Sequence, residues 1–113
     1  MLAATVKPAP MTGSPVLLAV ARGVTRLTLN RPQAGNAMTP QLTAVLREHA
    51  AALAARDDVR VVVLAAAGKV FCVGGDLGWM AEQGDDVGPA LHAMATDLHA
   101  AIELLAACDA RPS

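Results

Sequence analysis

Residues 61–77 organise the chain, and they read Val61-Val62-Val63-Leu64-Ala65-Ala66-Ala67-Gly68-Lys69-Val70-Phe71-Cys72-Val73-Gly74-Gly75-Asp76-Leu77. The continuous apolar run at the start, with three consecutive valines, is typical of a strand buried on both faces, as in a parallel sheet. Gly68 ends this run, and the paired glycines Gly74 and Gly75 then precede Asp76 and a helical pattern. A strand, a glycine loop and a helix start leave backbone N–H groups free to bind an anion or to stabilise an oxyanion.

Two shorter strands precede this stretch, at residues 16–21 and 24–29. Arg22-Gly23 between them is a turn signal, and the short spacing predicts a β-hairpin. Residues 1–14 are rich in proline and small residues without any period, which predicts a mobile leader. We therefore expect one folded domain over residues 15–113.

Three helices are predicted around the central stretch. Thr39 is the expected N-cap of a helix that runs to about Arg56, with a proline at its first position. Asp76 is expected to cap a short helix ending near Gln83, and a long helix follows over residues 87–107. The apolar stripe of the long helix comprises Leu91, Met94, Leu98, Ile102 and Leu105, helped by Ala95 and Ala101. The order strand, strand, helix, strand predicts an α/β fold.

Composition excludes several classes of protein. The 113 residues carry a net charge of −1, so the clustered basic charge of a nucleic-acid-binding protein is absent. No apolar run approaches the roughly 20 residues that span a bilayer, and no signal-peptide pattern opens the sequence. Two cysteines are too few for a disulfide scaffold. These features predict a cytoplasmic protein that binds neither nucleic acid nor membrane.

Side chains that carry chemistry are scarce and isolated. His92 and His99 share a helix face, but no third ligand is patterned with them, so we expect no metal site. Cys72 has no histidine nearby in the sequence to act as its base, and a small buried residue is the favoured interpretation. From the residues alone, the glycine loop is a candidate ligand-binding loop and no more.

Two segments resemble the signatures of one family. Residues 60–77 are similar to the crotonase (enoyl-CoA hydratase/isomerase) pattern R-V-V-V-L-x-G-x-G-x-x-F-[CS]-x-G-[AG]-D-L. Upstream, Leu27-Thr28-Leu29-Asn30-Arg31-Pro32 and Asn36-Ala37-Met38 resemble the second signature, L-T-L-N-R-P…N-A-[LM]. The two signatures stand in the family's order, with a helix between them, and the resemblance covers about residues 16–112.

The resemblance implies a ClpP/crotonase-like spiral of β-β-α units, of which this chain carries the N-terminal half. It implies an acyl-CoA thioester substrate, with no separate cofactor because coenzyme A is part of that substrate. The Gly75 backbone N–H becomes one of two oxyanion donors that stabilise a thioester enolate during hydration or double-bond migration. Val73 offers a backbone carbonyl to the adenine amine. The residues implied to line the coenzyme A path are Ala34, Ala37, Val73, Gly75, Asp76, Leu77 and Gly78. Full-length relatives imply a homotrimer or a hexamer.

Three hypotheses remain open. In the family, the second oxyanion donor and the catalytic acids follow the point where this sequence stops, at Ser113. The first hypothesis is a hydratase or isomerase whose N-terminal part alone does not turn over substrate. The second is a non-catalytic acyl-CoA-binding or assembly module completed by another chain. The third is a truncated product without function, whose exposed apolar stripes predict aggregation.

Overall fold

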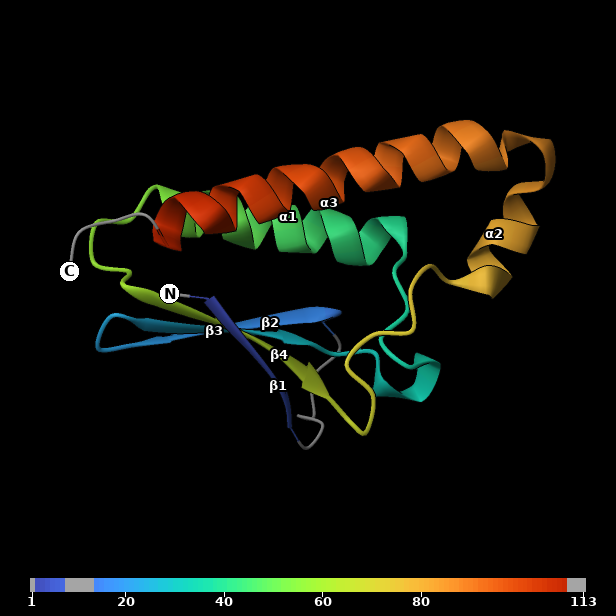
Figure 1. Ribbon diagram of the computed structural model, residues 1–113. Helices are drawn as coiled ribbons and strands as arrows, with labels where there is room; N and C mark the ends of the chain where they lie inside the picture. The colour runs from blue at the N-terminus through green and yellow to red at the C-terminus, as the bar shows by residue number, and fades with distance from the viewer. Residues whose placement is uncertain (1, 8–13, 110–113) are drawn as a thin grey trace.

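The computed structural model describes residues 2–7 and 14–109, and the strands within them form one sheet with helices on one face (Figure 1). The strands are β1 (Leu2–Lys7), β2 (Val16–Ala21), β3 (Val24–Leu29) and β4 (Val61–Ala67). The helices are α1 (Pro40–Ala54), α2 (Leu77–Gln83) and α3 (Val87–Asp109), and the 3-10 turns are η1 (Pro32–Ala34) and η2 (Gly84–Asp86). The sheet order is β1-β4-β3-β2, and the predicted α/β class is confirmed.

The predicted hairpin forms from β2 and β3, which pair antiparallel from Val16–Leu29 to Ala21–Val24. Arg22 and Gly23 connect the strands with φ of 54° and 80°. Both values lie in the left-handed region, and such two-residue turns match the right-handed twist of the strands they join. The hairpin therefore follows from local sequence.

The central strand β4 pairs parallel with β3, from Val24–Val61 to Leu29–Ala66. Ala65, Ala66 and Ala67 are fully buried, as predicted for a strand covered on both faces. Val61 and Val63 are only half-buried. They alternate with residues of the helix-covered face, and both long helices lie on that one face (Figure 1).

The predicted mobile leader at residues 1–14 is wrong for Leu2–Lys7. These residues form β1, which pairs parallel with β4 from Leu2–Val62 to Lys7–Ala67. The segment contains neither glycine nor proline, and it satisfies the second backbone edge of β4. Its partner lies sixty residues further along the chain, so local composition does not report the pairing. Residues 1 and 8–13 of the predicted leader lie outside the described residues.

The helix boundaries follow the predicted caps. Thr39 is the N-cap of α1, where its hydroxyl accepts the Leu42 N–H at 3.2 Å, and Pro40 takes the first helical position. The helix ends at Ala54, two residues before the predicted end. Helix α3 runs alongside α1, and an ion pair of 2.8 Å between Arg47 and Asp97 joins the two helices.

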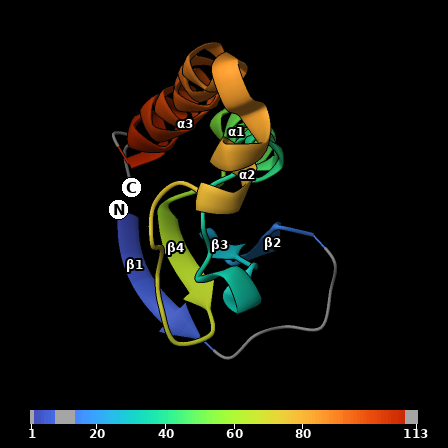
Figure 2. The same cartoon turned by 90° about the vertical axis from the view of Figure 1, so that its right-hand side faces the viewer.

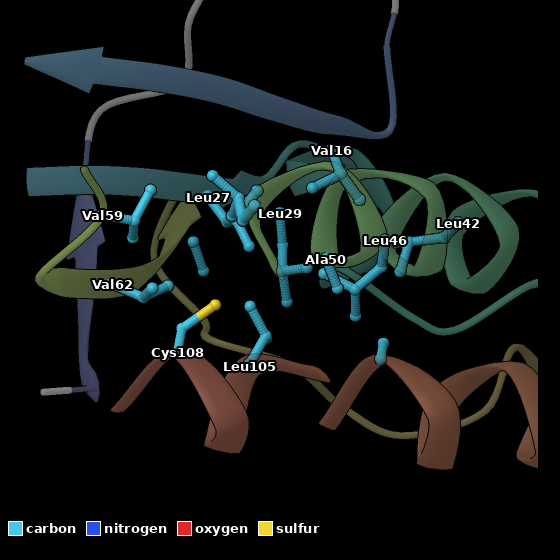
Figure 3. Close-up of a cluster of buried hydrophobic side chains, with 13 residues drawn as sticks. Val16, Leu27, Leu29, Leu42, Leu46, Ala50, Val59, Val62, Leu105 and Cys108 are labelled. Atoms are coloured by element: carbon cyan, nitrogen blue, oxygen red, sulfur yellow. The ribbon is translucent and has the colours of Figure 1, made fainter. Parts of the chain in front are cut away.

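The core lies between the sheet and the helix pair. Figure 3 shows Leu105 and Cys108 reaching from α3 toward side chains of the sheet and of α1. The predicted stripe of α3 is wrong at Ile102, which is 53% exposed, whereas Ala101 is fully buried. At 3.6 residues per turn the buried face passes through Ala101, and a small side chain there lets the two helices approach closely. The buried cluster comprises Val16, Leu27, Leu29, Leu42, Leu46, Ala50, Leu53, Val59, Val62, Ala66, Ala101, Leu105 and Cys108.

Candidate functional site

The loops that leave β3 and β4 come together at one end of the molecule, below the start of α3 (Figure 2). Because β3 and β4 are parallel neighbours, their carboxyl ends meet at the same edge of the sheet. We call the loop that leaves β3 the first loop and the loop that leaves β4 the second loop. An isolated parallel bridge joins Met38 of the first loop to Gly75 of the second loop. The Met38 N–H donates to the Gly74 carbonyl at 2.7 Å, and the Asp76 N–H donates to the Met38 carbonyl at 2.9 Å. The two sequence motifs therefore form one structural unit.

Asn36 holds this unit together from inside. Its side chain is fully buried, and its amide nitrogen donates to the carbonyls of Ala67 at 2.9 Å and Val70 at 2.8 Å. Its amide oxygen accepts the Arg31 N–H at 2.8 Å. The residue adopts a φ of 56°, a conformation that asparagine tolerates better than most residues. A buried asparagine thus joins the end of β4 to the first loop.

Two glycines let the loops approach each other. Gly35 has a φ of 62°, and a Cβ there would lie 2.9 Å from Val73 Cγ1 of the second loop. Gly68 has a φ of 86°, and a Cβ there would lie 2.8 Å from Pro32 Cβ. The Val73 N–H donates to the Gly35 carbonyl at 3.1 Å, so the close approach also forms a backbone hydrogen bond. Side chains at either glycine would push the loops apart.

Asp76 is the N-cap of α2, as predicted. One carboxylate oxygen accepts the Trp79 N–H at 2.9 Å, and the other accepts from Arg31 Nη2 at 3.1 Å. These donors stabilise the charged carboxylate, the Trp79 N–H most and the Arg31 guanidinium next, and they hold its pKa below the ordinary 3.8. Asp76 is therefore an ionised anchor near neutral pH, with both of its oxygens already in use.

The direction of the Gly75 N–H follows from the bridge. The Gly74 carbonyl points at Met38, and a trans peptide places its N–H opposite its carbonyl, so the Gly75 N–H points away from Met38. Within residues 2–7 and 14–109, no group accepts a hydrogen bond from this N–H. The Gly75 N–H is thus a backbone donor whose direction is fixed by the contact between the two loops.

A hollow of about 530 Å³ lies on one side of this donor. Its lining residues are Ala34, Ala37, Val73, Gly75, Asp76, Leu77 and Met80. Six of the seven residues predicted for the coenzyme A path are therefore brought together, and Gly78 is not among those that line the hollow. Met80 also lines the hollow and was not among the residues predicted for the coenzyme A path. Its position one helical turn after Asp76 is the signal that places it against Gly75.

A second hollow of about 320 Å³ lies toward α3 and is almost entirely apolar. Its lining residues are Met38, Thr43, Gly74, Gly75, Leu91, Met94, Ala95 and Leu98. The four α3 residues among them had no predicted site role, although Leu91, Met94 and Leu98 belong to the predicted apolar stripe of α3. Gly75 lines both hollows, so its backbone lies where a ligand that occupies both would pass.

Other chemistry is not assembled in the described part of the chain. No three His, Cys, Asp or Glu side chains within it group closely enough to hold a metal ion. Cys72 is half-buried, and its sulfur accepts the Gly74 N–H at 3.4 Å. None of the helices in these ranges combines the length and apolar character needed to cross a membrane.

Fold and site together define an α/β protein whose candidate site is built from the backbone of two glycine-containing loops. Gly75 lines two hollows, and its N–H has no acceptor in the described part of the chain. A sequence profile of the enoyl-CoA hydratase/isomerase family matches residues 24–110. The chain belongs to this family, also called the crotonase family, as its two signatures predicted.

Relatives in sequence and structure agree with this assignment. The chain is 41% identical to a probable enoyl-CoA hydratase of Mycobacterium tuberculosis over 68% of its own length and 30% of that protein's. It is 47% identical to (E)-benzylidenesuccinyl-CoA hydratase of Thauera aromatica, over 56% of its own length and 25% of that protein's. The crystal structure of an enoyl-CoA hydratase of Mycobacterium smegmatis matches with a TM-score of 0.70 and 46% identity, over 79% of this chain and 35% of that one. The chain thus has a crotonase fold over about a third of such structures, and it spans a quarter to a third of the sequence relatives.

Proposed function

We propose that this chain provides the coenzyme A wall and one oxyanion donor of a site that acts on acyl-CoA thioesters. The observation that carries the proposal is the backbone N–H of Gly75, which has no hydrogen-bond acceptor in the described part of the chain and belongs to a residue that lines both a mixed hollow and an apolar one. The names of the two sequence relatives support the same substrate class, because both are hydratases of CoA thioesters.

The two hollows suit the two ends of such a thioester. The apolar hollow beneath α3 takes the acyl group, since its walls are mainly leucine, methionine and alanine. The hollow lined by Ala34, Val73 and Leu77 takes the pantetheine and adenine parts of coenzyme A, with Gly78 further along the same path. Gly75 lines both, so the thioester carbonyl lies against its N–H.

The chemistry follows from that placement. When a base removes a proton beside the thioester, or water adds to its double bond, negative charge develops on the carbonyl oxygen. A preorganised N–H stabilises that charge more than it stabilises the neutral carbonyl, and losing one such donor costs about 100- to 1000-fold in rate. In this proposal Gly75 stabilises the enolate of a hydration or a double-bond migration.

The proton-transfer groups do not come from the walls of the two hollows. Asp76 is the one carboxylate that lines either hollow in the described part of the chain, and its oxygens are engaged by Trp79 and Arg31. We therefore expect this chain by itself to bind acyl-CoA without turning it over. This observation equally favours the second candidate, an acyl-CoA-binding or assembly module completed by another chain. Trimeric or hexameric assembly and a cytoplasmic location stay predictions.

Calorimetric titration with crotonyl-CoA and with free coenzyme A tests the proposal. We expect the chain to bind crotonyl-CoA more tightly than free coenzyme A, and the hydrogen bond from Gly75 should supply about three- to tenfold of that preference. Gly75→Pro removes the N–H and should reduce the preference by that factor. The matched control Gly75→Ala keeps the N–H, and its Cβ meets only the flexible end of Met80.

Two results would overturn the proposal. One is a folded chain, verified by circular dichroism, that gives no heat with either ligand at millimolar concentration. The other is a preference for crotonyl-CoA that Gly75→Pro leaves unchanged. Hydration of crotonyl-CoA by the isolated chain would instead overturn the expectation of binding without turnover.

A further inference from the structure

We infer that Arg31 is a positioning residue for the oxyanion donor, which it orients and polarises through two peptide groups without touching the ligand itself. The inference rests on the proposed role of Gly75. Arg31 belongs to the upstream signature, Leu27-Thr28-Leu29-Asn30-Arg31-Pro32, and the sequence patterns gave it no role of its own.

The first step is the contact between Arg31 and the first loop. Arg31 Nη1 donates to the Ala37 carbonyl at 2.5 Å. The Ala37 carbonyl and the Met38 N–H belong to one peptide group, so this charged donor lies at one end of a planar unit whose other end points at the second loop. Hydrogen bonds from a guanidinium are about twice as strong as those between neutral groups.

The second step passes from one loop to the other. The Met38 N–H donates to the Gly74 carbonyl at 2.7 Å, and that carbonyl shares its peptide with the Gly75 N–H. The guanidinium, two aligned peptides and the free N–H therefore form one chain of donors and acceptors. Each hydrogen bond in such a chain polarises the next, by roughly 10–30% per bond. The positive charge of Arg31 thus makes the Gly75 N–H a better donor while the same bonds hold its direction.

The third step is the anchor that keeps Arg31 in place. Arg31 Nη2 donates to the Asp76 carboxylate at 3.1 Å, and the two side chains are only 23% and 19% exposed. Asp76 is fixed in turn by the Trp79 N–H and by its own N–H on the Met38 carbonyl. The planar fork of arginine makes both contacts at once, whereas the single ammonium of a lysine cannot reproduce this geometry.

The chain offers a matched control. Arg47 and Asp97 form an ion pair of 2.8 Å between α1 and α3, with 48% and 28% exposure, and neither residue lines either of the two hollows. Arg47→Met removes one arginine and one ion pair, as Arg31→Met does, but it leaves the two loops intact. Effects of Arg31→Met that Arg47→Met does not share therefore report on the site and not on net charge or general stability.

The first readout needs no ligand. In ¹⁵N-labelled chain, Arg31→Met should move the amide protons of Met38 and Gly75 upfield, because the hydrogen bond of the first weakens and the second loses polarisation. Arg31→Lys keeps the charge and should give a smaller shift in the same direction. Arg47→Met should leave both resonances in place. Unchanged Met38 and Gly75 resonances in a folded Arg31→Met chain overturn the inference.

The second readout uses a conjugated thioester, 2,4-hexadienoyl-CoA, whose absorption moves to longer wavelength when its carbonyl oxygen accepts a hydrogen bond. We expect Arg31→Met to reduce this shift and to weaken hexadienoyl-CoA binding about three- to tenfold, with less than a twofold effect on free coenzyme A. An equal loss for both ligands means that Arg31 only supports the binding surface, which refutes a positioning role.

The two readouts separate failure of the inference from failure of the proposed function. If the wild-type chain binds no thioester, the proposed function fails, while the amide shifts still decide whether Arg31 orients Gly75. If the wild-type chain binds hexadienoyl-CoA with a red shift that Arg31→Met preserves, the function stands and the inference fails. If Arg31→Met does not fold, Arg31→Lys supplies both measurements.

Discussion

Replacing Asn36 with alanine should destabilise the chain more than most single substitutions do, because Asn36 connects both loops of the site to the end of β4. The alanine variant loses two hydrogen bonds to carbonyls, of 2.9 and 2.8 Å, and one from a backbone N–H, of 2.8 Å. It also places alanine at a φ of 56°. All of this occurs at a residue that is fully buried.

The size of the effect follows from these contacts. Three hydrogen bonds at about 0.5–1.5 kcal/mol each, and roughly 1 kcal/mol for alanine in the left-handed region, give a loss of about 2.5–5.5 kcal/mol. A domain of this size has a total stability of about 5–15 kcal/mol, so the loss is a large fraction of it. With a urea m-value of about 1.5 kcal/mol/M, a loss of 4 kcal/mol lowers the midpoint of unfolding by roughly 2–3 M.

Urea unfolding followed by circular dichroism and by the fluorescence of Trp79, the single tryptophan, measures the effect. Asn36→Gly separates its causes, because glycine accepts the positive φ but lacks the hydrogen bonds, so it should remain strongly destabilised. Asn36→Asp keeps the acceptor for the Arg31 N–H but turns a carboxylate toward two carbonyls, so it should be at least as damaging as alanine. A loss below about 1 kcal/mol for Asn36→Ala would refute the reasoning.

Three further outcomes are expected from urea unfolding. Gly35→Ala should lower the free energy of unfolding by about 2–3 kcal/mol, because its Cβ would meet Val73 and its φ is 62°. Gly84→Ala, at a φ of 56° but in open space, should cost only about 1 kcal/mol. Equal losses would contradict the importance of the close approach between Gly35 and Val73. Thr25→Val should be neutral or stabilising by up to about 1 kcal/mol, since the fully buried Thr25 hydroxyl has no partner in the described part of the chain, and a clear loss of stability would contradict this. The pKa of Asp76 is lowered in the folded chain, so the stability that its carboxylate contributes is complete above pH 3.8 and is lost as the pH falls through the lower folded value. The difference in free energy of unfolding between the wild type and Asp76→Asn should therefore shrink in that acidic range. A pH-independent difference would show that the carboxylate charge contributes nothing.

Most secondary structure in this chain is readable from local sequence. The Arg22-Gly23 turn, the Thr39 and Asp76 caps and the apolar run of β4 each act through residues that are neighbours in the chain. Helical periodicity likewise predicted α3, although it misassigned Ile102, whose burial depends on how closely α1 approaches.

The candidate site was only partly predictable. The strand–glycine–helix pattern by itself indicated the glycine loop, whereas the lining residues Ala34, Ala37, Val73, Asp76 and Leu77 came from the resemblance of two motifs to the family. Neither periodicity nor spacing indicated that Leu91 and Met94 of α3 would line a second hollow with Gly75. Helix packing sets that placement.

Local sequence therefore determined the turn, the helix starts and every strand except β1, because caps and periodic patterns act within a few residues. The pairing of β1 with β4 and the bridge between Met38 and Gly75 arise only on folding, because their partners are distant in sequence and meet through the parallel sheet. The direction of the Gly75 N–H also arises only on folding, because the hydrogen bond from the Met38 N–H to the Gly74 carbonyl orients the peptide group that joins Gly74 to Gly75.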